Sequence, residues 1–295
     1  LFYGLGSYLF FIFQPKTILS SFFVFSLIFG LLEFLRGSVF TGFPWNLIVS
    51  SFSNQLEILA IISVIGTYGF NLFCISLFVS PSLLIIKEKS TDIIICFLFF
   101  ISLIFFYIYG STYKDRFYNA DKKESDYNVR VIGSNVSLER FYNNIDPVSV
   151  INDLIEISNP ILKEKTIFVW PEGIIPNTYQ ENLIEYDWIF DEKFDENHIL
   201  IIGINSKQVN NGSQNYFNSL SVYDNELNLL SSYNKINLVP FGEFLPLENF
   251  LKNFGLKSLT NNYQSYSSGE ERKIINIKRQ NFSLKFLPLI CYEII

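Results

Sequence analysis

The chain has 295 residues, of which 49% are hydrophobic and 18% aromatic, and its mean hydropathy of +0.26 is high for a water-soluble protein. The formal net charge of −6 provides no basic surface for nucleic acid, which excludes that class of partner. Three separated cysteines and one histidine form neither a disulfide framework nor a zinc site, so neither metal nor cofactor is expected. Because methionine is absent, we expect a piece of a longer protein that lacks both ends.

Long apolar segments fill the first part of the chain. Residues 93–109, IIICFLFFISLIFFYIY, carry a single polar side chain, Ser102, and approach the ~20 residues that cross a bilayer. Residues 17–35 and 58–86 are further candidate spans, and residues 1–13 read as part of a fourth. The sequence therefore predicts a helical, multi-span membrane domain over residues 1–110.

Charges in this domain predict its orientation and one local pair. Lys16, Lys87 and Lys89 fall on one side of alternating spans and Arg36 on the other, so the positive-inside rule places the lysines in the cytoplasm. The chain after Gly110 then lies outside the cytoplasm. Within the third candidate span, 17–35, the intruding Glu33 lies three residues before Arg36, and the two are expected to pair.

The pattern changes after a polar linker at residues 111–126. Short β-prone runs predict strands, and residues 146–159 predict a helix with Asp146 as N-cap and Pro147 as its first residue. Alternating strands and helices favour an α/β domain over residues 127–295. The expected strands are residues 129–135, 166–172, 198–205, 216–224 and 282–293.

Three chemically capable residues stand where these apolar runs end. Glu172 follows FVWP, Lys235 precedes the loop INLVPFGEFLP, and Cys291 lies in the terminal run LICYEII. A thiol becomes a good nucleophile only when deprotonated, so a carboxylate could serve as base and a lysine could stabilise an oxyanion. Taken singly, they also fit a solvated turn carboxylate, a surface lysine and a buried cysteine. The residues permit a Glu/Lys/Cys set without demonstrating one.

The terminal run carries a second expectation. If it forms a strand, alternation puts Cys291 and Glu293 on one side and Tyr292 on the other. Glu293 would then help to shape the same pocket as Cys291.

Four motifs carry a family resemblance. VWPEG, YNKINLVPFGEFLP and ICYE, in this order, resemble the Glu–Lys–Cys triad motifs of the nitrilase (carbon–nitrogen hydrolase) superfamily. LRGSVFTGFPWN, residues 35–46, resembles its membrane branch, the apolipoprotein N-acyltransferases. The resemblance implies a multi-span helical membrane domain followed by a nitrilase-like α-β-β-α sandwich, here incomplete at its C-terminus.

The resemblance also implies roles for individual residues. Glu172 matches the general base, Lys235 the triad lysine and Cys291 the nucleophile. Asn237 stands where the family usually has a histidine. Residues implied to line or support the substrate pocket are Glu243, Tyr292, Glu293 and, where the family often has tryptophan, Phe141.

The implied activity is acyl transfer from a phospholipid to the N-terminal amine of a diacylglyceryl-cysteine lipoprotein, through a cysteine thioester. A monomer at the bacterial inner membrane, with its catalytic domain on the periplasmic side, is expected. Its partners would be the phospholipid donor, the apolipoprotein acceptor and membrane lipid. The apolar loop 237–246 is expected to gate the site.

Two alternatives remain open. A membrane-tethered amidase could use the same triad, although it would need no extended LVPFGEFLP loop. A non-catalytic membrane protein is the other alternative, against which the intact Glu172, Lys235 and Cys291 argue.

Overall fold

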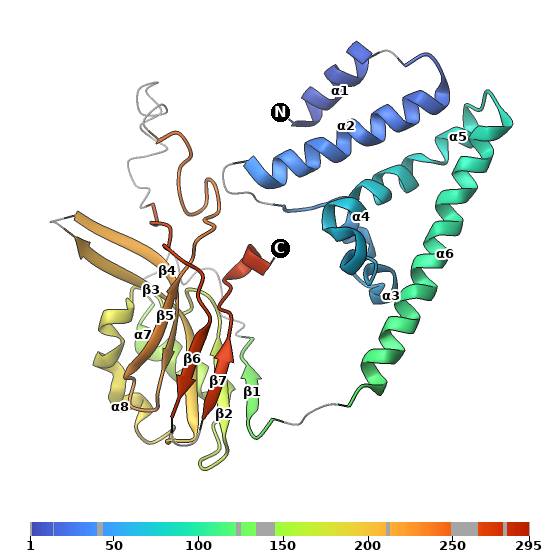
Figure 1. Ribbon diagram of the computed structural model, residues 1–295. Coiled ribbons are helices and arrows are strands. Elements are labelled where there is room, and N and C mark those ends of the chain that lie inside the picture. Colours follow the sequence, from blue (N-terminus) through green and yellow to red (C-terminus); the bar gives the residue numbers. More distant parts are fainter. Residues whose placement is uncertain are drawn as a thin grey trace. The chain divides into compact units, whose positions relative to one another are not determined.

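The structure is a computed structural model that divides into two compact units, residues 1–123 and 124–295 (Figure 1). Each unit is described by itself. The described residues are 2–13, 15–39, 44–121, 125–133, 145–210, 213–248, 265–279 and 282–294.

The first unit is built from apolar helices. Three segments are long and apolar enough to cross a membrane: α2 (Ile18–Ser38), the segment Ile62–Ile85 and α6 (Ser90–Asn119). These spans confirm the membrane protein that the sequence predicts. The other helical elements are α1 (Phe2–Phe13), η2 (Ile48–Phe52), α3 (Leu56–Leu59), α4 (Ile62–Val79) and α5 (Ser82–Ile85), of which α4 and α5 make up the second span.

Helix α6 is longer than the sequence analysis expects. It continues to Asn119, so residues 111–119, predicted as linker, are helical. Helix α3 packs against this C-terminal end of α6, where Lys114 forms an ion pair of 2.6 Å with Glu57. A Cβ on Gly110 would collide with the Glu57 carbonyl, so the glycine permits the close approach.

The expected pair in α2 is present. Arg36 Nη2 lies 2.9 Å from Glu33 Oε2, and the hydroxyl of Tyr3 in α1 donates to Glu33 Oε1 at 2.7 Å. Glu33 is buried, and the two donors satisfy its carboxylate.

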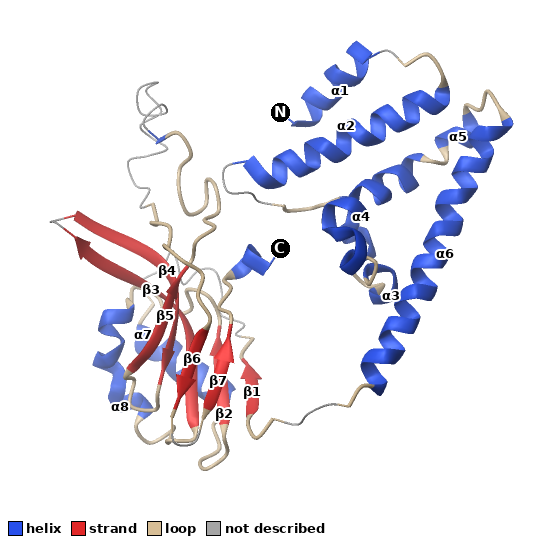
Figure 2. Ribbon diagram, viewed as in Figure 1, coloured by secondary structure: helices blue, strands red, loops and turns tan. Residues whose placement is uncertain are grey.

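The second unit contains a mixed five-stranded sheet in the order β1-β2-β3-β4-β5 (Figure 2). The first three strands are parallel, and β3, β4 and β5 are antiparallel neighbours. Their bounds are β1 (Asn128–Val131), β2 (Thr166–Trp170), β3 (His198–Asn210), β4 (Ser213–Tyr223) and β5 (Leu229–Asn234).

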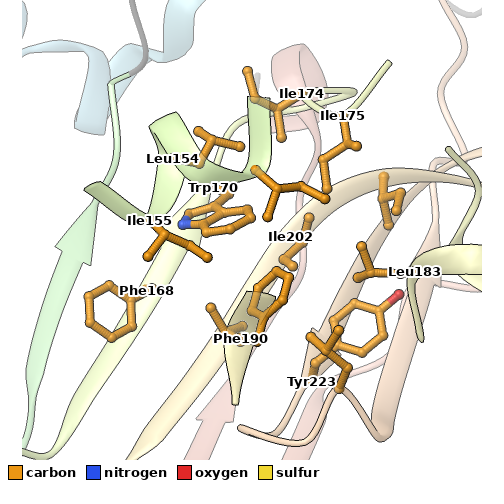
Figure 3. Close-up of a cluster of buried hydrophobic side chains, with 14 of the residues drawn as sticks. Leu154, Ile155, Phe168, Trp170, Ile174, Ile175, Leu183, Phe190, Ile202 and Tyr223 are labelled. Carbon is orange, nitrogen blue, oxygen red and sulfur yellow. The ribbon is translucent and has the colours of Figure 1, made fainter. Parts of the chain in front are cut away.

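The second unit has two hydrophobic cores, one on each face of the sheet, and successive side chains of β2 point alternately into one and the other. Phe168 and Trp170 pack under α7 (Pro147–Ser158) and α8 (Asp187–Phe190), where Figure 3 shows the cluster of apolar side chains. Ile167 faces the opposite core, against the hairpin of β6 (Ile275–Lys278) and β7 (Ser283–Phe286). The predicted fold class, membrane helices followed by an α/β domain, is confirmed, and the described residues supply three layers of the expected sandwich.

Helix α7 begins as predicted. The side chain of Asp146 accepts a hydrogen bond from the Val148 N–H at 3.1 Å, and Pro147 is the first helical residue. Pro at this position lacks only an N–H that the helix would leave unpaired.

The last predicted strand is wrong in its extent. It ends at Phe286, and Cys291–Ile294 form a short 3-10 helix, η6. Cys291 has φ 55°, in the left-handed region, which a strand cannot accommodate. Pro288 likewise cannot donate to a ladder, so the apolar run turns instead of extending.

Candidate active site

Glu172 is placed by a turn at the end of β2. Gly173 has φ 55°, and the chain crosses closely over β3 at Gly203. A Cβ on Gly203 would lie 2.5 Å from both Glu172 Cα and the Pro171 carbonyl oxygen, so glycine is required there. The close crossing is fixed by a hydrogen bond of 3.3 Å from the Ile174 N–H to the Gly203 carbonyl.

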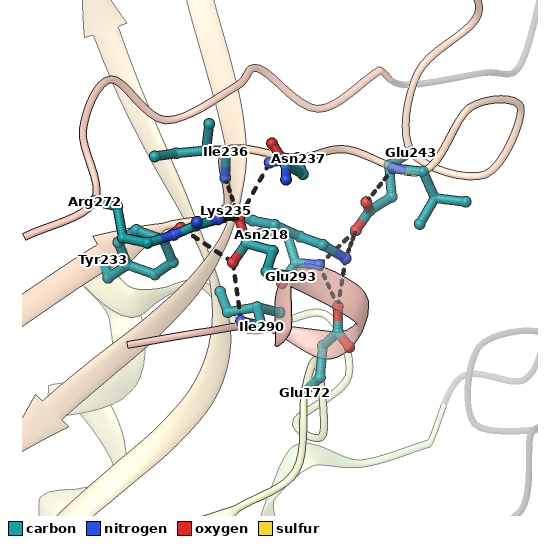
Figure 4. A network of polar contacts seen from close by, with 11 residues as sticks. Glu172, Asn218, Tyr233, Lys235, Ile236, Asn237, Glu243, Arg272, Ile290 and Glu293 are labelled. Atoms are coloured by element: carbon teal, nitrogen blue, oxygen red, sulfur yellow. Dashed lines mark hydrogen bonds and ion pairs between the residues drawn. The ribbon is translucent and has the colours of Figure 1, made fainter. Parts of the chain in front are cut away.

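Lys235 follows β5 and is almost fully buried. Its N–H donates to the Asn218 carbonyl at 2.9 Å, and its carbonyl accepts from Gly269 at 2.9 Å. Its Nζ lies 3.2 Å from Glu172 Oε1 and 3.0 Å from Glu243 Oε1 (Figure 4). Burial alone lowers the pKa of Lys235, but the two carboxylates outweigh burial and raise it, so the side chain remains an ammonium at neutral pH.

Asn218 is a site residue that the sequence analysis missed. Its Nδ2 donates to Glu172 Oε1 at 2.5 Å and to Glu243 Oε1 at 2.6 Å, so one amide group bridges the two carboxylates. Its Oδ1 is buried without a hydrogen-bond partner among the described residues. One feature of the sequence could have indicated it. Asn218 lies two residues before Leu220, so the two share a strand face, and Leu220 packs in a hydrophobic core, where an asparagine is unusual.

Glu243 lies in the loop after Lys235 and organises that loop. Its Oε2 accepts from the Val239 N–H at 2.7 Å, while its own N–H donates to the Val239 carbonyl at 2.8 Å. Phe241, at the tip, has φ 63° and is 65% exposed, and Phe244 is half-buried. The loop therefore presents an apolar tip while its base is fixed to the polar cluster.

Cys291 and Glu172 line the same cavity, which has a volume of about 220 Å³. Cys291 is exposed and opens η6, and Glu172 reaches the cavity from the end of β2. The remaining lining includes Trp170, Gly203, Ser219, Leu220 and Ile290. Cys291 and Glu172 therefore border one cavity, and Lys235 is ion-paired with the Glu172 carboxylate.

Glu293 does not share a strand face with Cys291, so the alternation prediction is wrong. Both residues belong to the helical turn η6, where positions two apart point in different directions. Cys291 is therefore exposed, while Glu293 is buried. Its carboxylate accepts hydrogen bonds of 2.9–3.2 Å from the Tyr233 hydroxyl, the backbone N–H groups of Ile236, Asn237 and Ile290, and Arg272 (Figure 4). It thereby ties the chain after Lys235 to the turn that carries Cys291.

These bonds set the charge state of Glu293. Burial alone raises its pKa, but the backbone N–H groups of Ile290, Asn237 and Ile236 outweigh burial and lower it. The group is therefore a carboxylate at neutral pH. Its negative charge links the chain that follows Lys235 to the turn that carries Cys291.

Of the other two predicted support residues, Tyr292 and Phe141, the structure describes only Tyr292. The ring centroid of Tyr292 lies 5.4 Å from Lys235 Nζ, a cation–π distance. Phe141 lies outside the described residues.

The chemistry available to this arrangement follows from its groups. A cysteine and a glutamate line one cavity, and a buried ammonium contacts the carboxylate of that glutamate. A second carboxylate, that of Glu243, also contacts the ammonium. Such a set can supply a nucleophile, a proton acceptor and a cation for an oxyanion.

Known proteins resemble this chain along most of its length. Residues 1–80 match the family model of the apolipoprotein N-acyltransferase N-terminal domain. The apolipoprotein N-acyltransferase of Brucella suis biovar 1 (strain 1330) is 28% identical over 274 residues, which cover 90% of this chain and 50% of that protein. The apolipoprotein N-acyltransferase of Caulobacter vibrioides (strain ATCC 19089 / CIP 103742 / CB 15) is 26% identical over 99% of this chain and 55% of its own length.

A crystal structure of an N-terminal amidase aligns with 56% of this chain and 40% of its own chain, at 15% identity and a TM-score of 0.31. The chain spans about half the length of the curated relatives it matches. The family model and these relatives confirm the resemblance that the sequence motifs indicate.

Proposed function

We propose that this chain, which resembles apolipoprotein N-acyltransferases through 90% of its length, is part of an enzyme that transfers an acyl chain from a phospholipid to a lipoprotein. The acceptor would be the α-amine of an N-terminal diacylglyceryl-cysteine. The observation that carries the proposal is the cavity shared by Cys291 and Glu172, with Lys235 bonded to Glu172.

In the first half-reaction Glu172 takes the proton from Cys291, and the sulfur attacks the ester carbonyl carbon of the phospholipid. The Sγ–C bond forms, the C–O bond to the glycerol breaks, and the proton passes from Glu172 to the departing oxygen. The products are an acyl thioester and a lysophospholipid. Lys235 stabilises the oxyanion of the tetrahedral intermediate.

In the second half-reaction the neutral α-amine attacks the thioester carbonyl. Glu172 takes a proton from the nitrogen, the C–Sγ bond breaks, and the proton returns to the sulfur. The lipoprotein then carries an amide, and the thiol is regenerated. The proposed site faces the periplasm, because the positive-inside rule places the chain after α6 outside the cytoplasm.

The membrane unit supports this reaction over hydrolysis of a small amide. Both proposed substrates carry acyl chains, and each CH₂ moved from lipid into water costs about 0.8 kcal/mol. Three membrane-spanning helices keep the enzyme where these chains already lie. A tethered amidase would gain nothing from that position.

The experiment supplies the intact protein in detergent with a phospholipid whose acyl chain is labelled. We expect a hydroxylamine-labile label that Cys291→Ala abolishes and Glu172→Gln slows by orders of magnitude. Adding a diacylglyceryl-cysteine peptide should move the label to the peptide amine, as mass spectrometry of its N-terminus would show.

Cys74→Ala is the matched control, because Cys74 is buried among the membrane helices. Retention of the label in Cys291→Ala would contradict the nucleophile. Labelled fatty acid released without transfer would favour a hydrolase instead. Absence of any label in the wild type would favour a non-catalytic role.

A further inference from the structure

Asn218 lies on β4, which has a neighbouring strand on each side, β3 and β5. Its backbone carbonyl accepts the Lys235 N–H at 2.9 Å. Its side-chain Nδ2 donates to Glu172 Oε1 at 2.5 Å and to Glu243 Oε1 at 2.6 Å (Figure 4). One residue inside the sheet is therefore bonded to all three charged residues of the candidate site.

The two carboxylates are bound through the same oxygen of each. Glu172 Oε1 accepts from Asn218 Nδ2 and from Lys235 Nζ, and Glu243 Oε1 accepts from the same two nitrogens. None of the described residues donates a hydrogen bond to the second oxygen of Glu172, Oε2. Because Oε1 is occupied by two donors, Oε2 is the oxygen that can exchange a proton in the cavity that Cys291 lines.

The two donors differ in what they supply. An ammonium is a compact point charge whose three N–H bonds rotate at the end of a flexible stem. A carboxamide is planar and neutral, and its NH₂ group points two N–H bonds in fixed directions. Lys235 therefore attracts both carboxylates, whereas Asn218 sets their direction and separation without adding a second positive charge.

The other end of the Asn218 amide argues against a role in packing alone. Its Oδ1 is buried and has no hydrogen-bond partner among the described residues. A buried acceptor without a partner costs free energy, which an apolar side chain at this position would avoid. Leu220, on the same face of β4, packs in a hydrophobic core in that way. The arrangement thus favours a role for the two N–H groups.

We propose that Asn218 is a positioning residue that holds Glu172 through Oε1 and thereby presents Oε2 to the thiol of Cys291. The inference rests on the proposed function for the roles of Glu172 and Cys291. It adds to that function the residue that orients the base. Asn218 acts through Glu172 and does not itself touch the reacting atoms.

The test measures how fast iodoacetamide alkylates Cys291 in the intact protein in detergent, by mass spectrometry of the peptide that carries this cysteine. The sulfur displaces iodide as the S–C bond forms, and Glu172 takes the thiol proton, so the reaction needs neither phospholipid nor lipoprotein. We expect Asn218→Ala to slow alkylation roughly tenfold, as part of the ~10²–10⁴-fold that a positioned base contributes. An unchanged rate would overturn the proposal.

A double-mutant cycle shows whether Asn218 acts through Glu172. Glu172→Gln removes the base, so adding Asn218→Ala to it should cause no further loss of alkylation rate. If the two losses multiply in the double variant, Asn218 acts independently of Glu172 and the proposal is wrong.

Two further variants separate orientation from folding. Asn218→Asp keeps the shape of the side chain but has no N–H donor at neutral pH, so alkylation should be at least as slow as in Asn218→Ala; a wild-type rate would assign Asn218 to packing. Ser221→Ala is the matched control on β4, because Ser221 is buried on the opposite face and loses a hydrogen bond of 2.7 Å to Gln180. It should lower the melting temperature and leave the alkylation rate unchanged. Slower alkylation in Ser221→Ala as well would mean that any loss of stability slows the thiol.

Acylation from a labelled phospholipid, measured in parallel, separates this inference from the proposed function. A wild type that is never acylated, with alkylation slowed in Asn218→Ala, would contradict acyl transfer and retain the positioning role. A wild type that is acylated, with both rates unchanged in Asn218→Ala, would overturn the positioning role alone.

Discussion

At the scale of single residues, the candidate site depends on one cation between two carboxylates. Lys235 is buried, and Asn218 holds Glu172 and Glu243 against it by donating to both. The sequence motifs predicted the two glutamates and the lysine, because each stands beside a recognisable turn. Asn218 could not be predicted in this way, since a lone polar residue in a strand has no motif around it.

Lys235→Met should affect both stability and activity. Without the ammonium, the two carboxylates face each other with only the Asn218 amide group between them. Losing one partner of a buried ion pair costs ~3–5 kcal/mol, and the loss here should be smaller because Glu172 reaches solvent. Thermal unfolding measures the loss of stability, and acyl-enzyme formation should fall ~10²–10³-fold. Lys278→Met, at an exposed position, is the control; wild-type acylation in Lys235→Met would refute the role.

Glu293→Gln should remove an acid-sensitive tie. The pKa of Glu293 is lowered in the folded protein, so its contribution is fully present above the unfolded value of about 4.5 and is lost as pH falls through the folded pKa. The melting temperature of the wild type should therefore drop as pH falls below that value. The variant should have a lower melting temperature than the wild type at neutral pH. Its melting temperature should also fall less steeply as the solution is acidified. Parallel curves for both proteins would show that Glu293 does not titrate in this way.

At the scale of elements, the sequence predicted helices and strands best where apolar length or β-branched runs set the pattern. The membrane spans and β2, β3 and β4 were found for that reason. Strand β5, with sequence LLSSYN, was missed because its serines give no apolar alternation. The run ending in ICYE was read as a strand because composition does not reveal the positive φ of Cys291.

Gly203→Ala should displace the turn that carries Glu172. The added methyl would lie 2.5 Å from the Glu172 Cα, and backbone atoms cannot rotate away as a side chain can. We expect a loss of ~1–3 kcal/mol, which lowers the melting temperature by several degrees, together with a larger loss of acylation. Gly133→Ala is the control, since its Cβ would have no atom within 4 Å. Full activity in Gly203→Ala would show that the close crossing is unnecessary.

The loop after Lys235 remains a predicted gate, and the structure identifies the better residue for its test. Phe241 is 65% exposed at the loop tip, whereas Phe244 is half-buried. Phe241→Ser should slow acyl transfer and leave the melting temperature in detergent nearly unchanged. Phe244→Ser provides the comparison, because loss of packing there should lower the melting temperature. An unchanged rate of acyl transfer in Phe241→Ser would contradict the prediction that this loop gates the site.

At the scale of the whole molecule, the prediction to test is that α6 crosses the membrane and places the chain that follows it outside the cytoplasm. Helix α6 has 30 residues and a length of ~45 Å, longer than the ~30 Å hydrocarbon core. Reporter fusions near Lys87 and near Asn119 should give opposite signals, cytoplasmic and periplasmic respectively. The same signal at both positions would mean that α6 does not cross the bilayer.

The exposed turn at Cys291 has a practical consequence. The other two cysteines of residues 1–295, Cys74 and Cys96, are buried among the membrane helices, so a bulky maleimide dye should modify this part of the protein at Cys291. A sulfur already holding an acyl group cannot react with the dye. Fluorescence of this cysteine on a gel would then report the fraction of protein molecules whose Cys291 thiol is free, without radioactivity or an engineered tag.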